Sequence, residues 1–314
     1  MATGSYYLYV AAGLLLLFSF VGHVIHTVLL ANGRRLAAVL APGRQPAFAG
    51  VVTGSFVESR AGLGSGGAGE GDRSVAGPFA IAFAWSAWGT LGVSLLLRAI
   101  VVGRGPWGNM YEFVVAFVFG ILLGYLYLQR RYPAMRSLGL IPTGIALALF
   151  LYSTFLPSAV EQLVPALQNP PLLTIHVGMA MISYGIFATS FAAGVGYLLQ
   201  GPEDRYAWLP SHKVLDAVAY RAVIIGFPIF ATMIILGSYW GSIAWSAWWS
   251  WDPKETAALV TWLIYAVYLH ARNQRGWAGR PAALILVVGF AMILVTLSGN
   301  LWFSGLHAYS GLTN

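Results

Sequence analysis

Residues 240–251 contain five of the twelve tryptophans in this 314-residue chain, and two histidines lie at the ends of apolar runs elsewhere. The tryptophans are Trp240, Trp245, Trp248, Trp249 and Trp251, and the histidines are His176 and His307. Neutral imidazole is a good iron ligand, and two imidazoles can occupy the opposed axial positions of one porphyrin. Indole rings give a flat macrocycle contact area and offset stacking. These residue types together indicate a haem site, with iron between His176 and His307 and the ring against the tryptophans.

Membrane-spanning helices are the elements that must position these residues. Hydrophobic residues make up 58% of the chain and charged residues 9%, against roughly 25% charged in soluble domains. Such a chain has too little polar surface to cover a soluble globule. We therefore predict an all-α fold, a polytopic membrane helix bundle.

Apolar runs set the number of helices, since about 20 apolar residues cross a bilayer. Eight runs are present, near residues 6–30, 78–101, 111–129, 138–157, 172–199, 218–239, 256–271 and 281–303. No cation precedes the first run, and Arg34 and Arg35 follow it, so it is not a signal peptide and its N-terminus is expected outside. About eight transmembrane helices then place both termini outside.

The distribution of positive charge supports this orientation. With the N-terminus outside, fourteen of the seventeen lysines and arginines fall in or beside the inner loops, as the positive-inside rule requires. The net charge of +7 is explained in this way, without nucleic acid as a partner. The tryptophan cluster, His176 and His307 then all lie on the outer face, where Lys254, Arg98 and Arg104 are candidate partners for the haem propionates.

Ordinary structural roles compete for some of these residues. Tryptophan is enriched at membrane interfaces, and we assign Trp107, Trp208, Trp277 and Trp302 to such a belt, which does not require five tryptophans in one loop. Asp252 and Glu255 have the spacing of a capping box at the start of the seventh helix, with direct contact to the ligand as the alternative.

The remaining histidines have weaker signals. His270, near the inner end of the seventh run, is a functional candidate if it faces the bundle and is solvated by headgroups otherwise. His23 and His26 are three residues apart on one helix face, where packing between helices is favoured over ligation.

The chain has no cysteine, which excludes a thiol nucleophile, an iron–sulfur cluster and Cys-ligated zinc. Zinc fits two histidines less naturally than haem, because tetrahedral sites need further protein ligands. A solute transporter with an aromatic-lined pore is the alternative from another class, but it predicts ionisable or broken-helix features near the midplane, and few are found. A haem-free assembly scaffold is a third.

The run Trp240–Glu255 resembles the WWD domain of the haem-handling proteins of cytochrome c maturation, and within that group the chain is similar to the System II CcsA (ResC) family. Other stretches agree with this family, namely residues 103–113, 176–184, 219–228, 268–270 and 301–310. The resemblance divides the chain into residues 1–77, a first transmembrane helix with a Gly-rich inner linker, and residues 78–314, a haem-handling membrane domain with its WWD loop at 240–255.

The resemblance implies a role for each candidate residue. His176 and His307 match the external histidines that ligate haem iron, and are the expected catalytic residues. His270 matches a transmembrane histidine that receives haem on its way outward, and is a third expected iron ligand. The remaining expected haem contacts are Trp240, Trp245, Trp248, Trp249, Trp251 and Asp252.

The resemblance also implies a reaction and its partners. Haem b, preferably ferrous, is carried to the outer face and presented to the Cys-x-x-Cys-His thiols of an apocytochrome c, a holocytochrome c synthase (haem lyase) activity shared with a CcsB (ResB)-type membrane protein. Thiol-reducing factors act on the outer side. The expected location is the plasma (inner) membrane, with a thylakoid membrane as the alternative. The nearest rival within the group is System I haem delivery of the CcmC type to a haem chaperone.

Overall fold

The computed structural model describes residues 2–40, 74–160, 170–206, 208–274, 276–302 and 305–307, which form α-helices, one 3-10 helix and no strand. The helices are α1 (Ala2–Leu40), α2 (Ala76–Val102), α3 (Met110–Arg131), η1 (Pro133–Leu138), α4 (Leu140–Ser153), α5 (Pro170–Gln200), α6 (His212–Ala244), α7 (Pro253–Gln274) and α8 (Arg280–Trp302). Each predicted apolar run coincides with one α-helix, so the all-α prediction is confirmed. Most of the Gly-rich linker predicted before residue 77 lies outside the described residues.

Six of the eight α-helices are long and apolar enough to cross a membrane. They are Thr3–Asn32 of α1, Ala76–Val102, Met110–Arg131, Pro171–Gln200, His212–Ala244 and Arg280–Ser298 of α8. The helix α4 is apolar but has only 14 residues, and α7 carries charged residues in its first and last turns. The chain is therefore a polytopic helical membrane protein. Its shortest described α-helix is α4, and its least hydrophobic is α7.

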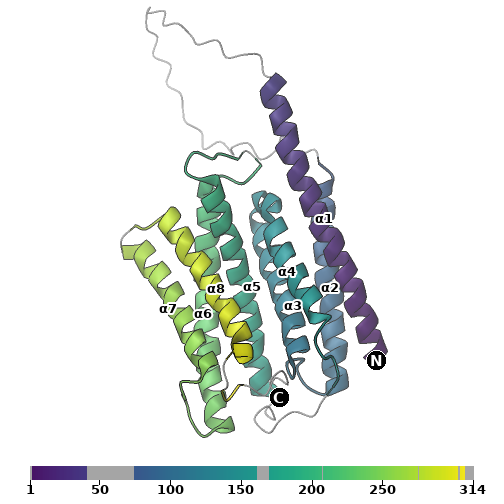
Figure 1. Ribbon diagram of the computed structural model, residues 1–314, viewed down its shortest axis with the longest axis vertical. Helices are drawn as coiled ribbons and strands as arrows, with labels where there is room; N and C mark the ends of the chain where they lie inside the picture. The colour runs from purple at the N-terminus through teal and green to yellow at the C-terminus, as the bar shows by residue number, and fades with distance from the viewer. Residues whose placement is uncertain are drawn as a thin grey trace, which may run out of the picture.

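The helices stand side by side in one bundle (Figure 1). The helices α1 and α2 lie at one edge, α7 lies at the other, and α3 and α5 lie between them. The beginning of α1 and the end of α8 are at the same end of the bundle (Figure 1). This arrangement agrees with the expectation that both ends of the helical region face the same side of the membrane.

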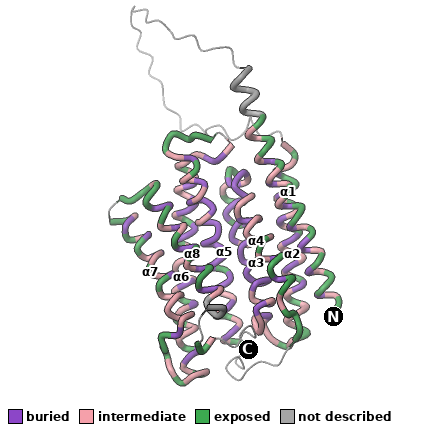
Figure 2. The backbone as a smooth tube through the Cα atoms, viewed as in Figure 1, coloured by how far each residue is buried: buried purple, intermediate pink, exposed green. Residues whose placement is uncertain are grey.

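The centre of the bundle is the contact between α3 and α5, where buried residues are concentrated (Figure 2). A Cβ added to Gly120 would overlap the carbonyl of Met181, and one added to Gly185 would overlap the carbonyl of Gly120. Small residues that let two backbones approach are typical of helix pairs in membranes. The outer helices instead expose apolar side chains such as Tyr7, Phe18 and Leu96, as a lipid-facing surface requires.

Candidate functional site

A pocket of about 1060 Å³, mouth included, lies at the end of the bundle where α8 ends. It is formed by α3, α5, α6, α7 and α8 together with residues 107–109, Trp249 and His307. Aromatic and aliphatic side chains form most of its wall, and His176, Lys254, Glu255 and His307 are its ionisable members. The two histidines that the sequence singled out therefore line one cavity, although 131 positions separate them.

His176 projects from the first turns of α5 toward α6. Its Nδ1 lies 2.9 Å from the carbonyl oxygen of Met233, so Nδ1 carries the proton and donates, and Nε2 carries the lone pair. Its ring lies nearly parallel to the indole of Trp240, at 18° and 6.3 Å between centroids. A Cβ on Gly237 would lie 2.7 Å from His176 Cε1, so the glycine makes room for the imidazole.

His307 follows α8 and is held by Asp252, which precedes α7. The His307 Nδ1 donates to Asp252 Oδ1 over 2.8 Å, and the Leu306 N–H donates to Asp252 Oδ2 over 2.6 Å. A Cβ on Gly305 would overlap Asp252 Oδ2, so this close approach requires a glycine. A carboxylate on the distal nitrogen fixes the tautomer of a metal-binding histidine and makes it more basic.

The ionisation of this pair follows from burial and hydrogen bonding. Burial lowers the pKa of His307 below its usual value, and Asp252 opposes this only in part. Burial raises the pKa of Asp252, but the hydrogen bonds from His307, Lys254 N–H and Leu306 N–H outweigh it and bring the pKa to about 2. At neutral pH His307 is therefore neutral, the form that coordinates iron, and Asp252 is a carboxylate.

Asp252 also begins α7, as the capping interpretation predicts. Its Oδ1 accepts from the Lys254 N–H at 2.9 Å, and the Glu255 Oε2 accepts from the Asp252 N–H at 3.3 Å. These reciprocal bonds are those of a capping box. One carboxylate therefore fixes the start of a helix and the orientation of His307, and its role in the pocket is to position a histidine.

We expect Asp252→Asn to weaken haem binding roughly 10–100-fold, the usual cost of losing such a supporting carboxylate. With its oxygen in the Oδ1 position the amide still caps α7 and accepts from His307, but its NH₂ then faces the Leu306 N–H. In the other orientation the NH₂ faces the N–H groups of His307 and Lys254. Titration of the purified protein with haem, followed by absorption, measures the effect. Thr256→Ala, which alters the same helical turn outside the pocket lining, is the control, and equal affinities for wild type and Asp252→Asn would contradict the assignment.

The five clustered tryptophans take different positions. Trp240 is buried and, with Trp249, lines the pocket. Trp245 packs edge-on against Trp240 and His307, with centroids 4.6 and 4.8 Å away. Trp248 and Trp251 are 62% and 68% exposed. The pocket therefore brings together three of the five rings, and the other two project outward.

The predicted loop at 240–255 is shorter than expected, because helices extend into it from both sides. Residues 240–244 contain no proline and continue α6 to Ala244. The chain leaves the helix at Trp245, whose N–H still bonds to the Gly241 carbonyl, and at Ser246, where φ is +57°. The connection is thus residues 245–252, and Trp240 is held rigidly on a helix.

Trp107 is the aromatic residue that sequence reasoning misjudged. It was expected in the interfacial belt, but it lines the pocket, and its Nε1 donates to Thr174 Oγ1 over 3.3 Å. The sequence did contain a signal for a structured role, since Trp107 stands in Gly105-Pro106-Trp107-Gly108-Asn109 directly before a helix. Asn109 caps that helix, α3, by accepting from the Glu112 N–H at 2.9 Å. Residues 107–110 are thus part of the pocket wall.

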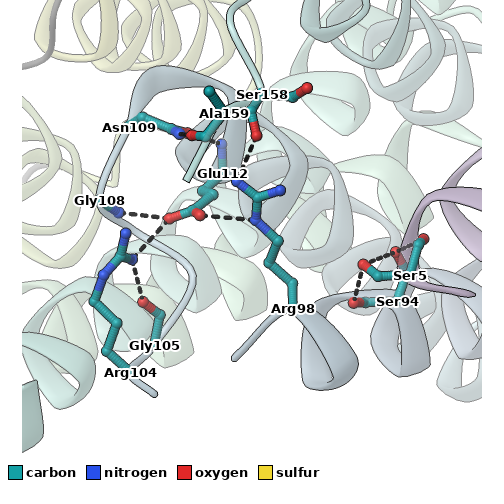
Figure 3. Close-up of polar contacts among 10 residues, drawn as sticks. All are labelled: Ser5, Ser94, Arg98, Arg104, Gly105, Gly108, Asn109, Glu112, Ser158 and Ala159. Atoms are coloured by element: carbon teal, nitrogen blue, oxygen red, sulfur yellow. Dashed lines mark hydrogen bonds and ion pairs between the residues drawn. The ribbon is translucent and has the colours of Figure 1, made fainter. Parts of the chain in front are cut away.

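Glu112 holds this wall in place (Figure 3). Its side chain is fully buried and pairs with Arg98 and Arg104, each over 2.8 Å. It also accepts the Gly108 N–H at 2.7 Å, while Arg98 reaches the Ser158 carbonyl at 2.7 Å. Arg98 and Arg104, two of the predicted propionate partners, are therefore committed to a carboxylate of the chain itself.

His270 lies away from this pocket, near the other end of α7. Its side chain is exposed and borders a shallow lateral depression with Leu263, Val267 and Trp277. It does not face the interior of the bundle, because it shares the outward stripe of α7 with the exposed Leu263 and Val267. Any ligand held by His270 therefore lies on the lateral surface of the bundle and not in its interior.

His23 and His26 are buried in α1. The Nε2 of His23 lies 3.3 Å from the hydroxyl of Tyr125 in α3. The packing role expected for this pair agrees with that contact.

The fold and pocket geometry define the class of protein. It is a multi-pass helical membrane protein with one aromatic pocket, lined by two histidines whose Nδ1 atoms are hydrogen-bonded within the chain. Comparison with known proteins gives the family. Residues 107–307, which include both histidines, match the model of the cytochrome c assembly protein family. The chain belongs to this family and has a role in cytochrome c biogenesis.

Individual relatives narrow the family to CcsA proteins. The chain is 35% identical over 250 residues to the cytochrome c biogenesis protein CcsA of Prochlorococcus marinus (strain MIT 9312), covering 69% of this chain and 80% of that protein. It is 35% identical over 252 residues to CcsA of Synechococcus sp. (strain CC9902), covering 70% and 82%. The predicted resemblance to CcsA proteins is thus confirmed.

Proposed function

We propose that this chain carries haem b and presents it for covalent attachment to apocytochrome c, as a subunit of a holocytochrome c synthase with a CcsB-type partner. The observation that carries the proposal is the pairing of His176 and His307 in one aromatic pocket, each with its Nδ1 held by an acceptor of the chain. In both imidazoles Nε2 is therefore unprotonated and can bind iron.

Each part of the pocket has a task in this reaction. His176 and His307 would hold the haem iron, and Trp240, Trp249 and Trp107 would pack against the macrocycle. Haem bound in this way brings two vinyl groups, which react with the thiols of a Cys-x-x-Cys-His segment. The chain contributes position, holding the vinyl groups where bound thiols can attack, and it has no cysteine of its own to compete.

Release of the product would require one protein histidine to leave the iron. The histidine of the Cys-x-x-Cys-His segment replaces one of the two protein histidines on the iron as the product leaves. We propose His270 as an earlier station, on the inner side. Because it faces outward from α7, its second iron ligand must come from another molecule, and the CcsB-type partner is the proposed source.

The relatives favour this function over its rivals. They are named CcsA, so System II attachment is preferred to CcmC-type delivery to a chaperone. We place the pocket on the outer side of the plasma membrane, or on the lumen side of a thylakoid membrane, since inner loops carry most cations. Proteins that keep the thiols reduced complete the proposed set of partners.

Co-expression tests the proposal. The chain is produced with its CcsB-type partner and an apocytochrome carrying Cys-x-x-Cys-His, and with a matched apocytochrome in which both cysteines are serine. We expect the first pair to give a cytochrome that keeps its haem in denaturing gels, and the second to give none. A chain that purifies without haem absorption, or that yields no covalent product when the partner and reductants are present, would refute it.

A further inference from the structure

Among the described residues, one cation lines the pocket. Of the described residues that line the pocket, Lys254 is the only lysine or arginine, and it stands in the first turn of α7 beside His307 and Trp249. Its ammonium lies 5.1 Å from the centre of the Phe113 ring, which also lines the pocket. The cation is therefore placed among apolar groups on the wall of the cavity itself.

The acids nearest to Lys254 in sequence are occupied by other donors. Asp252 accepts from His307, from Leu306 N–H and from the Lys254 N–H of the backbone. Glu255 Oε2 accepts from the N–H and hydroxyl of Ser250 and from Asp252 N–H. Among the ion pairs of the described residues, none includes the Lys254 ammonium. The ammonium has an aromatic ring at close range and interacts with Asp252 only through space, so it can still take an anionic ligand.

The other two cations predicted at this end of the bundle are not in the same situation. Arg98 and Arg104 both pair with the buried Glu112 (Figure 3). Neither arginine is among the described residues that line the pocket, and an anion bound to either would compete with a buried ion pair. Lys254 needs no such exchange.

We propose that Lys254 binds a carboxylate of the macrocycle that enters this pocket, which for haem is a propionate. This inference rests on the proposed function and adds orientation to it. Propionates and vinyl groups occupy opposite halves of the haem ring, so a propionate held at Lys254 turns the vinyl groups away from α7. The same contact favours a porphyrin with free carboxylates over its ester.

The experiment compares iron protoporphyrin IX with its dimethyl ester on the purified full chain. We expect wild type to bind the diacid roughly 10–100-fold more tightly than the diester, as a hydrogen bond between charged groups implies. Lys254→Met is expected to lose this preference by weakening diacid binding alone, and Lys254→Arg to keep it. Lys213→Met is the matched control, because Lys213 is the other lysine of the chain and is exposed at the opposite end of α6.

The outcomes separate this proposal from the function on which it rests. Equal affinity of wild type for diacid and diester, or a Lys254→Met protein that keeps the preference, overturns the assignment of Lys254 while the haem site stands. If wild type binds neither porphyrin, the proposed function falls and the assignment with it. The wild-type comparison decides the question even if Lys254→Met does not fold.

Discussion

Replacing His176 and His307 together by glycine is expected to abolish the haem absorption bands of the purified protein and the production of covalent cytochrome c. The two imidazoles are the proposed axial ligands, and their removal leaves the ring held only by aromatic contacts and Lys254. Each single variant should retain one ligand and bind more weakly, with altered bands. Added imidazole should restore part of the binding in the single variants, because glycine leaves space for it.

His212→Gly is the control for this series. His212 lies at the start of α6, where its ring pairs with Asp204 over 3.1 Å, at the other end of the helix from the pocket. It should leave the haem spectrum unchanged. A double glycine variant with the wild-type spectrum would refute the external bis-histidine site, whereas loss of colour together with loss of folded protein would point to a structural cause. Circular dichroism and gel filtration distinguish those two cases.

Glu112→Ala is expected to have the largest effect on stability. The change removes the acceptor for Arg98, Arg104 and the Gly108 N–H, and the arginine side chains are only 16% and 9% exposed. Breaking a buried ion pair from one side costs about 3–5 kcal/mol, because the remaining charge stays buried. The segment 103–109 would lose its anchor, so Trp107 would no longer be held in the pocket wall.

Thermal unfolding in detergent measures this effect, and haem titration measures its consequence. Asp204→Asn gives the matched control, since it removes an acid from an exposed pair with His212, and such pairs contribute about 0–1 kcal/mol. A triple variant with Glu112→Leu, Arg98→Met and Arg104→Met should recover much of the loss. If Glu112→Ala unfolds like the Asp204→Asn control, Glu112 does not anchor the wall.

The sequence was sufficient for the helices and for the two central histidines. Apolar runs of membrane length mark helices directly, and the placement of cations sorted their ends, so His176, His307 and the tryptophan cluster were expected on one face. Capping chemistry is local, and Asp252 with Glu255 was therefore readable from spacing alone.

The rest depended on contacts between distant segments. The bond from His307 to Asp252 spans 55 positions, and no local pattern marks it. Trp107 looked like an interfacial tryptophan because its partner Thr174 lies 67 positions away. The direction of His270 depended on how α7 rotates against α6 and α8, which a single weakly amphipathic helix does not specify.

The glycine contact between α3 and α5 has a mechanical consequence. The carbonyls of one helix lie against the glycines of the other. Neither helix can slide or rotate without a steric clash, so we call this rigid helix pair the spine. One wall of the pocket, with His176 on α5 and Phe113 on α3, is carried by the spine. The segment 245–252 and His307 are held instead by side-chain bonds, among them those of Ser250 to Glu255 and of His307 to Asp252. For the proposed haem site, His176 on α5 therefore has a fixed position in the bundle, whereas the orientation of His307 depends on its bond to Asp252.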